Sequence, residues 1–365
     1  MKIKEITAYL ENMAPLYLQE QYDNIGLLTG SNDWECTGVI TTLDATEAVI
    51  QEAVKEKCNL IVTHHPIIFS GLKKITGINY VDKTIISAIK NDIAIYAIHT
   101  NLDNIITGVN GKIADKLGLK NREVLLPKTH QLKKLSFFVP DTHAAFVRDA
   151  IFAAGAGCIG NYSECSFNTL GEGTFKPNEA AQPFIGTINS RHAVNEIKIE
   201  TVYPVWLEQA VIHALKLTHP YEEVAYDIFL LDNLYPKTGS GLAGDLSTEL
   251  SETHCMQLLQ DVFKLSVVRH TAFTGKMVKR IALCGGAGSF LIPHAIASGA
   301  QLYITADVKY HEFFNANNQM LLADIGHYES EQFTIDLLFD TLKEKFPTFA
   351  TLKTGINTNP VNYFR

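Results

Sequence analysis

The stretch Asn59-Leu-Ile-Val-Thr-His-His-Pro66 joins a short apolar run to two adjacent histidines. The run from Leu60 to Val62 is flanked by helix-like sequence, which is typical of a strand buried on both faces of a parallel sheet. The histidines then stand at the carboxyl end of that strand, and Pro66 favours extended backbone before it and helps to end the strand. Because open α/β sheets bind ligands at the carboxyl ends of their strands, we expect the chemistry of this chain at this edge.

His64 and His65 are candidate metal ligands. Neighbouring side chains of an extended segment point to opposite sides, so we predict that the pair does not chelate one ion together. Each histidine is instead expected to bind one of two neighbouring ions. The alternative is that both are polar residues at a strand end, held by ordinary hydrogen bonds.

Predicted strands alternate with predicted helices in the N-terminal and C-terminal parts of the chain. The segment between these parts has a different order of elements. The alternation indicates right-handed βαβ units and a mainly parallel sheet. In the N-terminal part we predict strands at 39–44, 59–63 and 93–98 and helices at 46–57 and 81–91. In the C-terminal part we predict strands at 279–284 and 302–305 and helices at 289–298 and 330–345.

The intervening segment follows a β-α-β-β-α-β order, which fits a ferredoxin-like α+β module. Its elements are a strand at 133–140, a helix at 143–154, short strands with glycine turns within 158–175, a strand at 196–200, a helix at 207–217 and a strand at 223–231. Pro127 and the stretch 233–244, rich in Pro, Gly and Ser, are plausible boundaries. We therefore expect an α/β fold: a split α/β domain (1–127 and 234–365) with mainly parallel sheets, and an inserted ferredoxin-like α+β domain (128–233).

The amino-acid composition argues against several classes of binding partner and site. The chain has 365 residues and a formal net charge of −8, which argues against a broad nucleic-acid-binding surface. Six cysteines without C-x-x-C spacing argue against a zinc ribbon or a redox motif, so we expect reduced, structural thiols. The start of the chain lacks a leader-like apolar run, and no stretch approaches the roughly 18 apolar residues of a membrane span. We expect a cytoplasmic protein without membrane contact.

Two further clusters carry candidate ligands. His99 and Asp103 follow the apolar run 93–98, at the sheet edge expected for the first pair, although an Asp in such a loop is often a turn former. His327 and Glu331 are four residues apart and share one face of a helix. The alternative for this second cluster is a helix start with acidic residues placed favourably near the positive end of the dipole.

The combined set contains nitrogen and oxygen ligands only, and consists of His64, His65, Asp103, His327 and Glu331. Such ligands suit zinc, iron, manganese or another divalent transition metal. Two ions in a hydrolytic centre share a bridging water that becomes nucleophilic near neutral pH, while the second ion stabilises the developing oxyanion. Five protein ligands leave positions open for that chemistry.

Several blocks of this sequence resemble the NGG-one-interacting-factor-three-like family, whose bacterial members are labelled GTP cyclohydrolase I type 2 homologues. The blocks are Thr63-His-His-Pro-Ile-Ile-Phe69, His99-Thr-Asn-Leu-Asp103, Gly326-His-Tyr-Glu-Ser-Glu331, Tyr22-Asp-Asn-Ile-Gly-Leu27 and Tyr303-Ile-Thr-Ala-Asp-Val-Lys-Tyr-His311. The resemblance covers essentially the whole chain. It implies a dinuclear metal centre with ligands at His64, His65, Asp103, His327 and Glu331, and a ring-shaped homohexamer. It also implies an insert similar to PII and CutA modules, whose motif His219-Pro-Tyr-Glu-Glu223 matches.

Ala306 departs from the family pattern, which has glycine there, and this affects a backbone turn more than a ligand. Four residues are candidates for orienting ligands or substrate through hydrogen bonds, with purely structural roles as the alternative: His99, Asp44, Asp307 and His311. The segment Cys284-Gly-Gly-Ala-Gly-Ser289 is interpreted as a tight strand-to-helix turn rather than a phosphate loop, since it lacks the Walker lysine.

Two functions remain open from the sequence. The first is a metal-dependent hydrolase of a nucleotide-like, phosphorylated or cyclic amide substrate; the family label implies opening of the GTP ring, but no residue here specifies guanine. The second is a non-catalytic assembly for metal storage, delivery or regulation.

Overall fold

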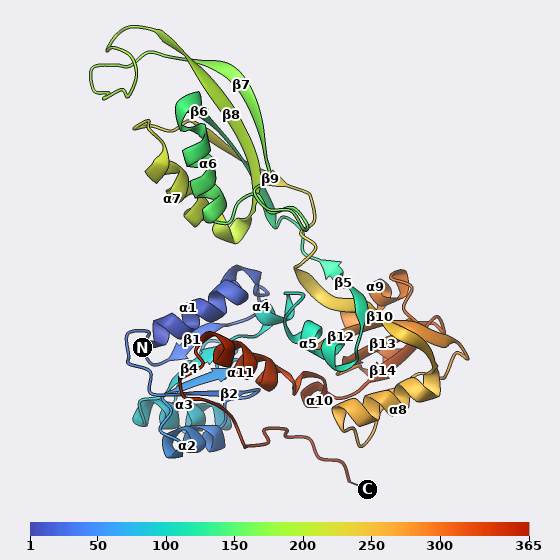
Figure 1. Ribbon diagram of the computed structural model, residues 1–365. Helices are drawn as coiled ribbons and strands as arrows, with labels where there is room; N and C mark the ends of the chain where they lie inside the picture. Colours follow the sequence, from blue (N-terminus) through green and yellow to red (C-terminus); the bar gives the residue numbers. More distant parts are fainter. Residues whose placement is uncertain (365) are drawn as a thin grey trace. The chain divides into compact units, whose positions relative to one another are not determined.

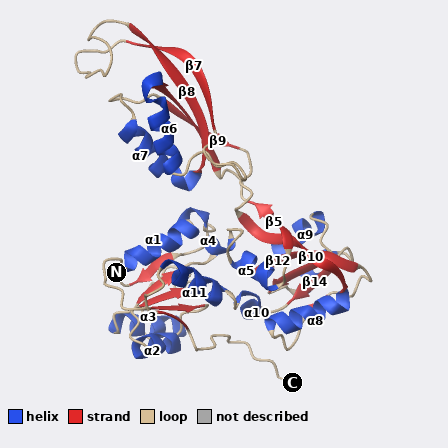
Figure 2. Ribbon diagram, in the orientation of Figure 1, coloured by secondary structure: helices blue, strands red, loops and turns tan. Residues whose placement is uncertain are grey.

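The computed structural model describes residues 1–364 as a chain of mixed helices and sheets (Figures 1 and 2). Contacts between Cα atoms divide the chain into two compact units. Unit 1 comprises Met1–Pro127 and Lys237–Arg365, and unit 2 comprises Lys128–Pro236. No helix of the described residues is long and apolar enough to cross a membrane.

The first sheet of unit 1 has the strand order β1-β4-β3-β2-β15. Strands β4, β3, β2 and β15 are parallel, and β1 is antiparallel to β4 at the edge. Their bounds are β1 Gly26–Thr29, β2 Val39–Thr42, β3 Leu60–Thr63, β4 Ala94–Ala97 and β15 Thr351–Lys353. Every residue of β2, β3 and β4 is buried, and for β3 this confirms the prediction of a strand covered on both faces.

Helices follow the strands of this sheet near the predicted positions. Thr46 and Asn79 accept hydrogen bonds from backbone amides at the starts of α2 and α3, because short polar side chains satisfy free N–H groups at a helix N-terminus. The helices and short 3-10 turn of this part are α1 Ile3–Met13, η1 Leu16–Leu18, α2 Glu47–Lys55, α3 Tyr80–Lys90, α4 Thr100–Asp103 and α5 Val109–Lys116. An apolar core that includes residues of α2, α3 and β3 fixes the sheet edge that carries the histidines.

The second sheet of unit 1 has the order β11-β14-β13-β12-β10-β5. Only β12, β13 and β14 are mutually parallel; β5, β10 and β11 join antiparallel, so the prediction of mainly parallel sheets is wrong here. The bounds are β5 Lys120–Pro127, β10 Gly239–Ser251, β11 Arg269–His270, β12 Met277–Ala287, β13 Leu302–Ala306 and β14 Leu321–Asp324.

Strand β10 begins in the glycine-rich stretch that the sequence suggested as a boundary. The glycine at 239 allows close strand pairing: a Cβ there would lie 2.2 Å from the Leu126 carbonyl oxygen. Glycine in a strand often marks such a close approach of two backbones. The same residues that resemble a linker therefore form the start of a central strand.

The helices around the second sheet differ from the prediction at one place. The single helix expected at 330–345 is two helices, α10 and α11. The bounds of the helical elements are α8 Glu252–Phe263, η4 Ser289–Leu291, α9 Ile292–Ala297, η5 Tyr310–Ala316, α10 His327–Glu331 and α11 Thr334–Lys345. The short α10 lies directly after β14 and so presents its side chains at the carboxyl edge of this sheet.

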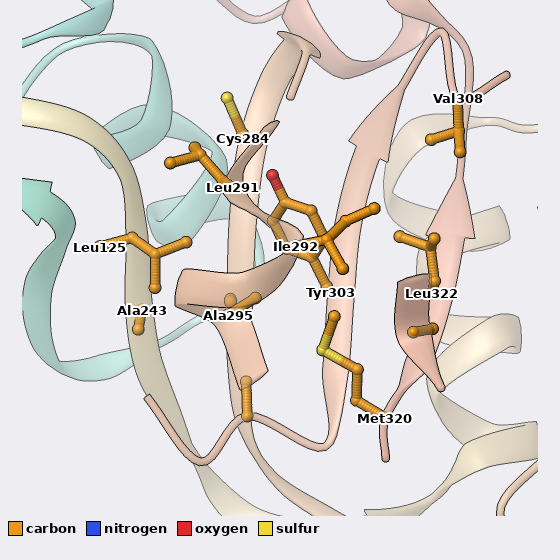
Figure 3. Close-up of a cluster of buried hydrophobic side chains, with 13 residues drawn as sticks. Leu125, Ala243, Cys284, Leu291, Ile292, Ala295, Tyr303, Val308, Met320 and Leu322 are labelled. Carbon is orange, nitrogen blue, oxygen red and sulfur yellow. The ribbon is translucent and has the colours of Figure 1, made fainter. Parts of the chain in front are cut away.

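Leu322 of β14 lies in the buried cluster shown in Figure 3, with Tyr303, Met320 and Ile292. Its side chain is fully buried. We expect Leu322→Ala to lower the free energy of unfolding by about 2–5 kcal/mol, because the truncation leaves a cavity in a packed core. Urea unfolding measures this, with Leu217→Ala, which truncates an exposed leucine, as the control. A Leu322→Ala loss no larger than that of the control would contradict the packing described.

Unit 2 is a four-stranded antiparallel sheet of order β7-β8-β6-β9 with two helices. Its elements are β6 Leu132–Pro140, η2 Asp141–His143, α6 Ala144–Ala153, β7 Ser166–Phe175, β8 His192–Pro204, η3 Val205–Leu207, α7 Glu208–Thr218 and β9 Tyr226–Leu231. The helices pack on one face, where Val147 and Val211 share a core with Phe137 and Ile199.

The hairpin of unit 2 is longer than the sequence suggested. Instead of short strands with glycine turns, β7 is one continuous strand, and its glycines at 171 and 173 pair with Glu196 and Val194 of β8. The unit also extends to Pro236 rather than to residue 233.

Candidate metal centre

The carboxyl ends of β3 and β4 place three histidines side by side. These parallel strands pair from Leu60 and Ala94 to Thr63 and Ala97, so both end at the same edge. His64 and His65 follow the first strand, and His99 follows the second. Asp103 is the last residue of α4, the short helix that starts directly after His99.

The rings of His64 and His65 turn towards one another, with centroids 4.9 Å apart. The expectation that they point to opposite sides is wrong, because the strand ends at Thr63 and both histidines lie in a bend. Thr63 Oγ1 lies 2.9 Å from the Leu43 carbonyl oxygen and 3.1 Å from that of His65, so both acceptors of this bend share its single hydroxyl hydrogen. One ligand atom each from His64, His65 and His99 lies within 4.8 Å of the others.

Glu331 of α10 brings the second sheet into the same cluster. Its Oε2 lies 3.0 Å from His65 Nε2 and 3.1 Å from His327 Nε2, and its Oε1 lies 3.9 Å from His64 Nε2. Asp103 Oδ1 is 3.6 Å from His64 Nε2. The two histidines from different sheets, His65 and His327, approach to 3.3 Å between their Nε2 atoms. The structure thus brings all five predicted ligands together.

A hydrogen bond at the other ring nitrogen orients each histidine. His65 Nδ1 bonds Asp44 at 2.8 Å, His327 Nδ1 bonds Asp307 at 2.6 Å and His99 Nδ1 bonds Asp23 at 2.9 Å. His64 Nδ1 lies 2.9 Å from the Ile98 carbonyl oxygen. Metal-binding histidines commonly donate their second N–H in this way, which fixes the tautomer and leaves the opposite nitrogen for the metal.

A family model described as Duf34/NIF3 (NGG1p interacting factor 3) matches residues 1–360. The chain belongs to the Duf34/NIF3 family. A Bacillus subtilis relative named GTP cyclohydrolase 1 type 2 homolog is 40% identical over 330 residues, covering 89% of this chain and 88% of that protein. A Halalkalibacterium halodurans relative of the same name is 38% identical over 358 residues, covering 97% and 96%. The solved Bacillus cereus protein related to NIF3 is 36% identical with a TM-score of 0.89, covering 100% and 99%.

The residues suggested as orienting groups occupy different positions in this Duf34/NIF3 chain. Asp44 and Asp307 bond to histidines of the cluster, whereas His99 faces the cluster itself. His311 is exposed on η5, and its ring packs against Tyr310 and Phe314 rather than against the cluster.

Asp23 is a residue that sequence reasoning missed. It precedes β1, and the antiparallel pairing of Gly26 with Ala97 brings it next to His99 at the end of β4. Its second oxygen accepts hydrogen bonds from the backbone and hydroxyl of Thr100. Burial alone would raise the pKa of Asp23, but the hydrogen bonds from His99 and Thr100 lower it to about 2. The one sequence feature that pointed to Asp23 was its place in the segment Tyr22-Asp-Asn-Ile-Gly-Leu27, which resembles the family.

The glycine-rich segment after Cys284 continues β12 as far as Ala287, and the expected strand-to-helix turn is made at Gly288, directly before η4. Gly286 has a φ of +65°, and a Cβ there would lie 2.3 Å from Glu331 Oε1. Its backbone N–H donates a hydrogen bond to Ser330 Oγ at 2.9 Å. Glycine therefore leaves room for the Glu331 carboxylate.

Asp307 has a left-handed backbone, with φ of +54°. Non-glycine residues in this conformation often occur at functional sites, where the surroundings hold the strain. The preceding Ala306, which departs from the family pattern, is the fully buried last residue of β13. The backbone therefore turns at Asp307 itself rather than at Ala306, and this turn brings the Asp307 carboxylate to His327.

The electrostatics of the cluster favour a bound cation. His64 Nε2 and Asp103 Oδ1 are buried and have no hydrogen-bond partner among the described residues. Burial raises the pKa of Asp103. A polar atom buried without a partner destabilises the fold, and a divalent cation between these atoms would remove that cost. Imidazole and carboxylate donors suit a divalent transition metal.

Proposed function

We propose that this site binds two divalent metal ions, with His64, His65, Asp103, His327 and Glu331 as ligands. The observation that supports this most directly is the position of the Glu331 carboxylate among the Nε2 atoms of three histidines, at 3.0, 3.1 and 3.9 Å. A carboxylate has two oxygens and can contact two ions at once. Zinc, iron and manganese all fit these donors.

The side chains that can bind a metal form two groups, each of which could hold one ion. One consists of His64, His65 and His99, and the other of His65, His327 and Glu331. The groups share His65, so two ions held there would be neighbours. Asp103 lies nearest to the first group, through its contact with His64.

We further propose that the centre catalyses hydrolysis of a nucleotide-like, phosphorylated or cyclic amide substrate, as the names of the relatives suggest. Two bound ions would supply an activated water and stabilise negative charge in the transition state. Asp44 and Asp307 would hold the imidazoles of His65 and His327 in place. A cavity of about 290 Å³ beside these two histidines, lined also by Arg269 and Tyr328, gives room for a small substrate group.

We also propose that residues 128–236 form an inserted ferredoxin-like domain of the PII or CutA type and that the protein is a homohexamer. The β-α-β-β-α-β order and the strand order β7-β8-β6-β9 support the first proposal. The second rests on the family resemblance. Light scattering of the full-length protein tests it, since a monomeric mass at micromolar concentration would reject the hexamer.

Metal analysis of the purified, metal-replete protein tests the shared prerequisite of these proposals. We expect about two ions per chain, and a clear loss in His65→Ala, because His65 belongs to both groups. His311→Ala removes an exposed imidazole outside the cluster and serves as the control. Fewer than about one ion per chain, unchanged by His65→Ala, would reject the dinuclear centre.

Turnover decides between the enzyme and a metal-storage, delivery or regulatory protein. The fully loaded protein is incubated with a panel of nucleotides, phosphoesters and cyclic amides, and products are measured with and without a chelator. Product formation that requires the metal and is lost in His65→Ala supports the hydrolase. A loaded centre without any turnover supports the non-catalytic alternative.

A further inference from the structure

The chain beyond β15 forms an extended segment, residues 354–364, that contains no helix or strand (Figure 1). Near its start the backbone N–H of Gly355 donates to Glu52 Oε1 of α2 at 2.7 Å. Further along, Asn359 Nδ2 donates to Glu329 Oε1 of α10 at 3.0 Å. The segment is therefore held at two points, one beside the first sheet and one on the helix that carries ligands from the second sheet.

Thr358 lies between these two points and reaches the carboxylate of Asp44. Its hydroxyl donates to Asp44 Oδ2 at 2.7 Å, across 314 positions of the sequence. The other oxygen of that carboxylate, Oδ1, lies 2.8 Å from His65 Nδ1. Because His65 belongs to both groups of candidate ligands, one hydroxyl of the C-terminal segment is linked to both groups through a single carboxylate.

The same arrangement occurs a second time around the cluster. One oxygen of Asp23 lies 2.9 Å from His99 Nδ1, and the other accepts a hydrogen bond from the hydroxyl of Thr100. At both places a threonine hydroxyl and an imidazole bind opposite oxygens of one carboxylate. The two hydrogen bonds together fix the plane of the carboxylate, and so fix the direction from which it accepts the N–H of the imidazole.

The Asp44 carboxylate depends on such a bond because burial does not hold it in place. Its side chain is 33% exposed, and that of His65 is 23% exposed. A hydrogen bond at the second ring nitrogen orients a metal-binding imidazole and leaves the opposite nitrogen for the metal. Water could replace the Thr358 hydroxyl, but a water molecule is not fixed by the fold. Loss of the hydroxyl should therefore loosen the imidazole rather than release it.

We propose that Thr358 is a positioning residue of the metal centre, which fixes the Asp44 carboxylate so that His65 keeps its Nε2 turned into the ligand cluster. This inference rests on the proposed function, since it requires a metal ion at His65. The same segment supplies Asn359, Pro360 and Val361 to the lining of the cavity of about 290 Å³ beside the cluster. The segment thus orients a ligand and also forms a wall of the proposed substrate cavity.

The test measures cobalt(II) binding to the full-length protein by competition with a chelator, and records the visible absorption spectrum of the bound cobalt. Thr358→Val keeps the shape of the side chain and removes the hydroxyl. We expect about three- to tenfold weaker binding and an altered spectrum, a smaller loss than the roughly 10- to 100-fold seen when a group that contacts the ligand itself is removed. Thr358→Ser restores the hydroxyl and should restore both the affinity and the spectrum.

Thr354→Val is the matched control, because it makes the same chemical change in the same segment. The Thr354 hydroxyl also donates to a carboxylate, that of Glu52, which lies outside both ligand groups. The N–H of Gly355 keeps the segment attached to Glu52 in this variant. We expect the cobalt spectrum to be unchanged and the affinity to stay within about twofold of the unaltered protein.

A double-mutant cycle separates an effect through Asp44 from a general loosening of the segment. In Asp44→Ala the carboxylate that Thr358 contacts is absent. Adding Thr358→Val to Asp44→Ala should therefore change the cobalt affinity by less than about 1.5-fold. A further loss as large as that in the unaltered background would show that Thr358 does not act through Asp44, and would overturn the proposal.

The proposal alone is also overturned if the unaltered protein binds cobalt and Thr358→Val matches its affinity and spectrum, if Thr354→Val shows the same loss, or if Thr358→Ser restores neither property. If the unaltered protein binds no cobalt, the proposed metal centre is rejected and this inference with it. Circular dichroism checks that the variants are folded. If Thr358→Val does not fold, Thr358→Ala replaces it, with Thr354→Ala as its control.

Discussion

Replacing Glu331 by Gln is expected to abolish tight metal binding, with affinity at least about 100-fold weaker for both ions. The carboxylate lies between His65 and His327 and close to His64, so its charge is shared by both ligand groups. An amide has the same shape but lacks that charge, and its NH₂ group cannot ligate a metal. Metal content after dialysis, measured by elemental analysis, reports the loss.

The matched control for this substitution is Glu329→Gln, the same chemical change two residues earlier in α10. The Glu329 carboxylate accepts a hydrogen bond from Asn359 at 3.0 Å and lies outside the histidine groups. It should retain its metal. Equal metal content in the two variants would show that Glu331 is not a ligand.

Metal-free protein is expected to lose stability as the pH rises from 7 to 10. Burial lowers the pKa of His65, but contacts with Asp44 and Glu331 outweigh it and raise the pKa to about 10. The pKa of His327 is likewise raised to about 9, against the effect of burial, mainly by Glu331. Both pKa values exceed the ordinary 6.5 of a histidine in the unfolded chain. The protonated imidazoles of His65 and His327 therefore stabilise the fold fully below about pH 6.5, and this stabilisation is lost as the pH rises through 9 to 10.

Thermal unfolding of chelator-treated protein between pH 7 and 10 measures this loss. His65→Gln removes one titrating group, so its melting temperature should fall less steeply over the same range. Metal binding requires neutral imidazoles and should therefore release protons at pH 7, which titration in two buffers of different ionisation enthalpy detects. Parallel pH profiles of the unaltered protein and His65→Gln, with no proton release, would contradict the expected protonation.

Much of the site could be predicted because its residues follow buried strands. The apolar runs before His64 and His99 identify two parallel strands, and parallel strands present their carboxyl ends at one edge. The spacing of His327 and Glu331 identifies a shared helix face. Local pattern and one topological rule were therefore sufficient to suggest that the histidines after β3 and β4 meet, whereas the family resemblance was needed to join His327 and Glu331 of the other sheet to them.

Other features depend on tertiary contacts that no local pattern records. The bend after Thr63 turns His64 and His65 to the same side, against the alternation expected of a strand. Asp23 reaches His99 only because β1 pairs antiparallel with β4. Glycines at 239 and 286 resemble linker or turn residues, yet each lies where a neighbouring backbone or the Glu331 carboxylate would clash with a side chain.

The two sheets of unit 1 each take an edge strand from the other part of the chain. β15 completes the first sheet beside β2, and β5 completes the second beside β10. A ribosome synthesises the chain from the N-terminus, so β2 has no β15 neighbour until almost the whole chain has been made. Over the same interval His64, His65 and Asp103 exist without His327 and Glu331. A nascent chain therefore carries an incomplete set of ligands. We expect metal ions to bind the proposed centre only after the C-terminal strands have been translated.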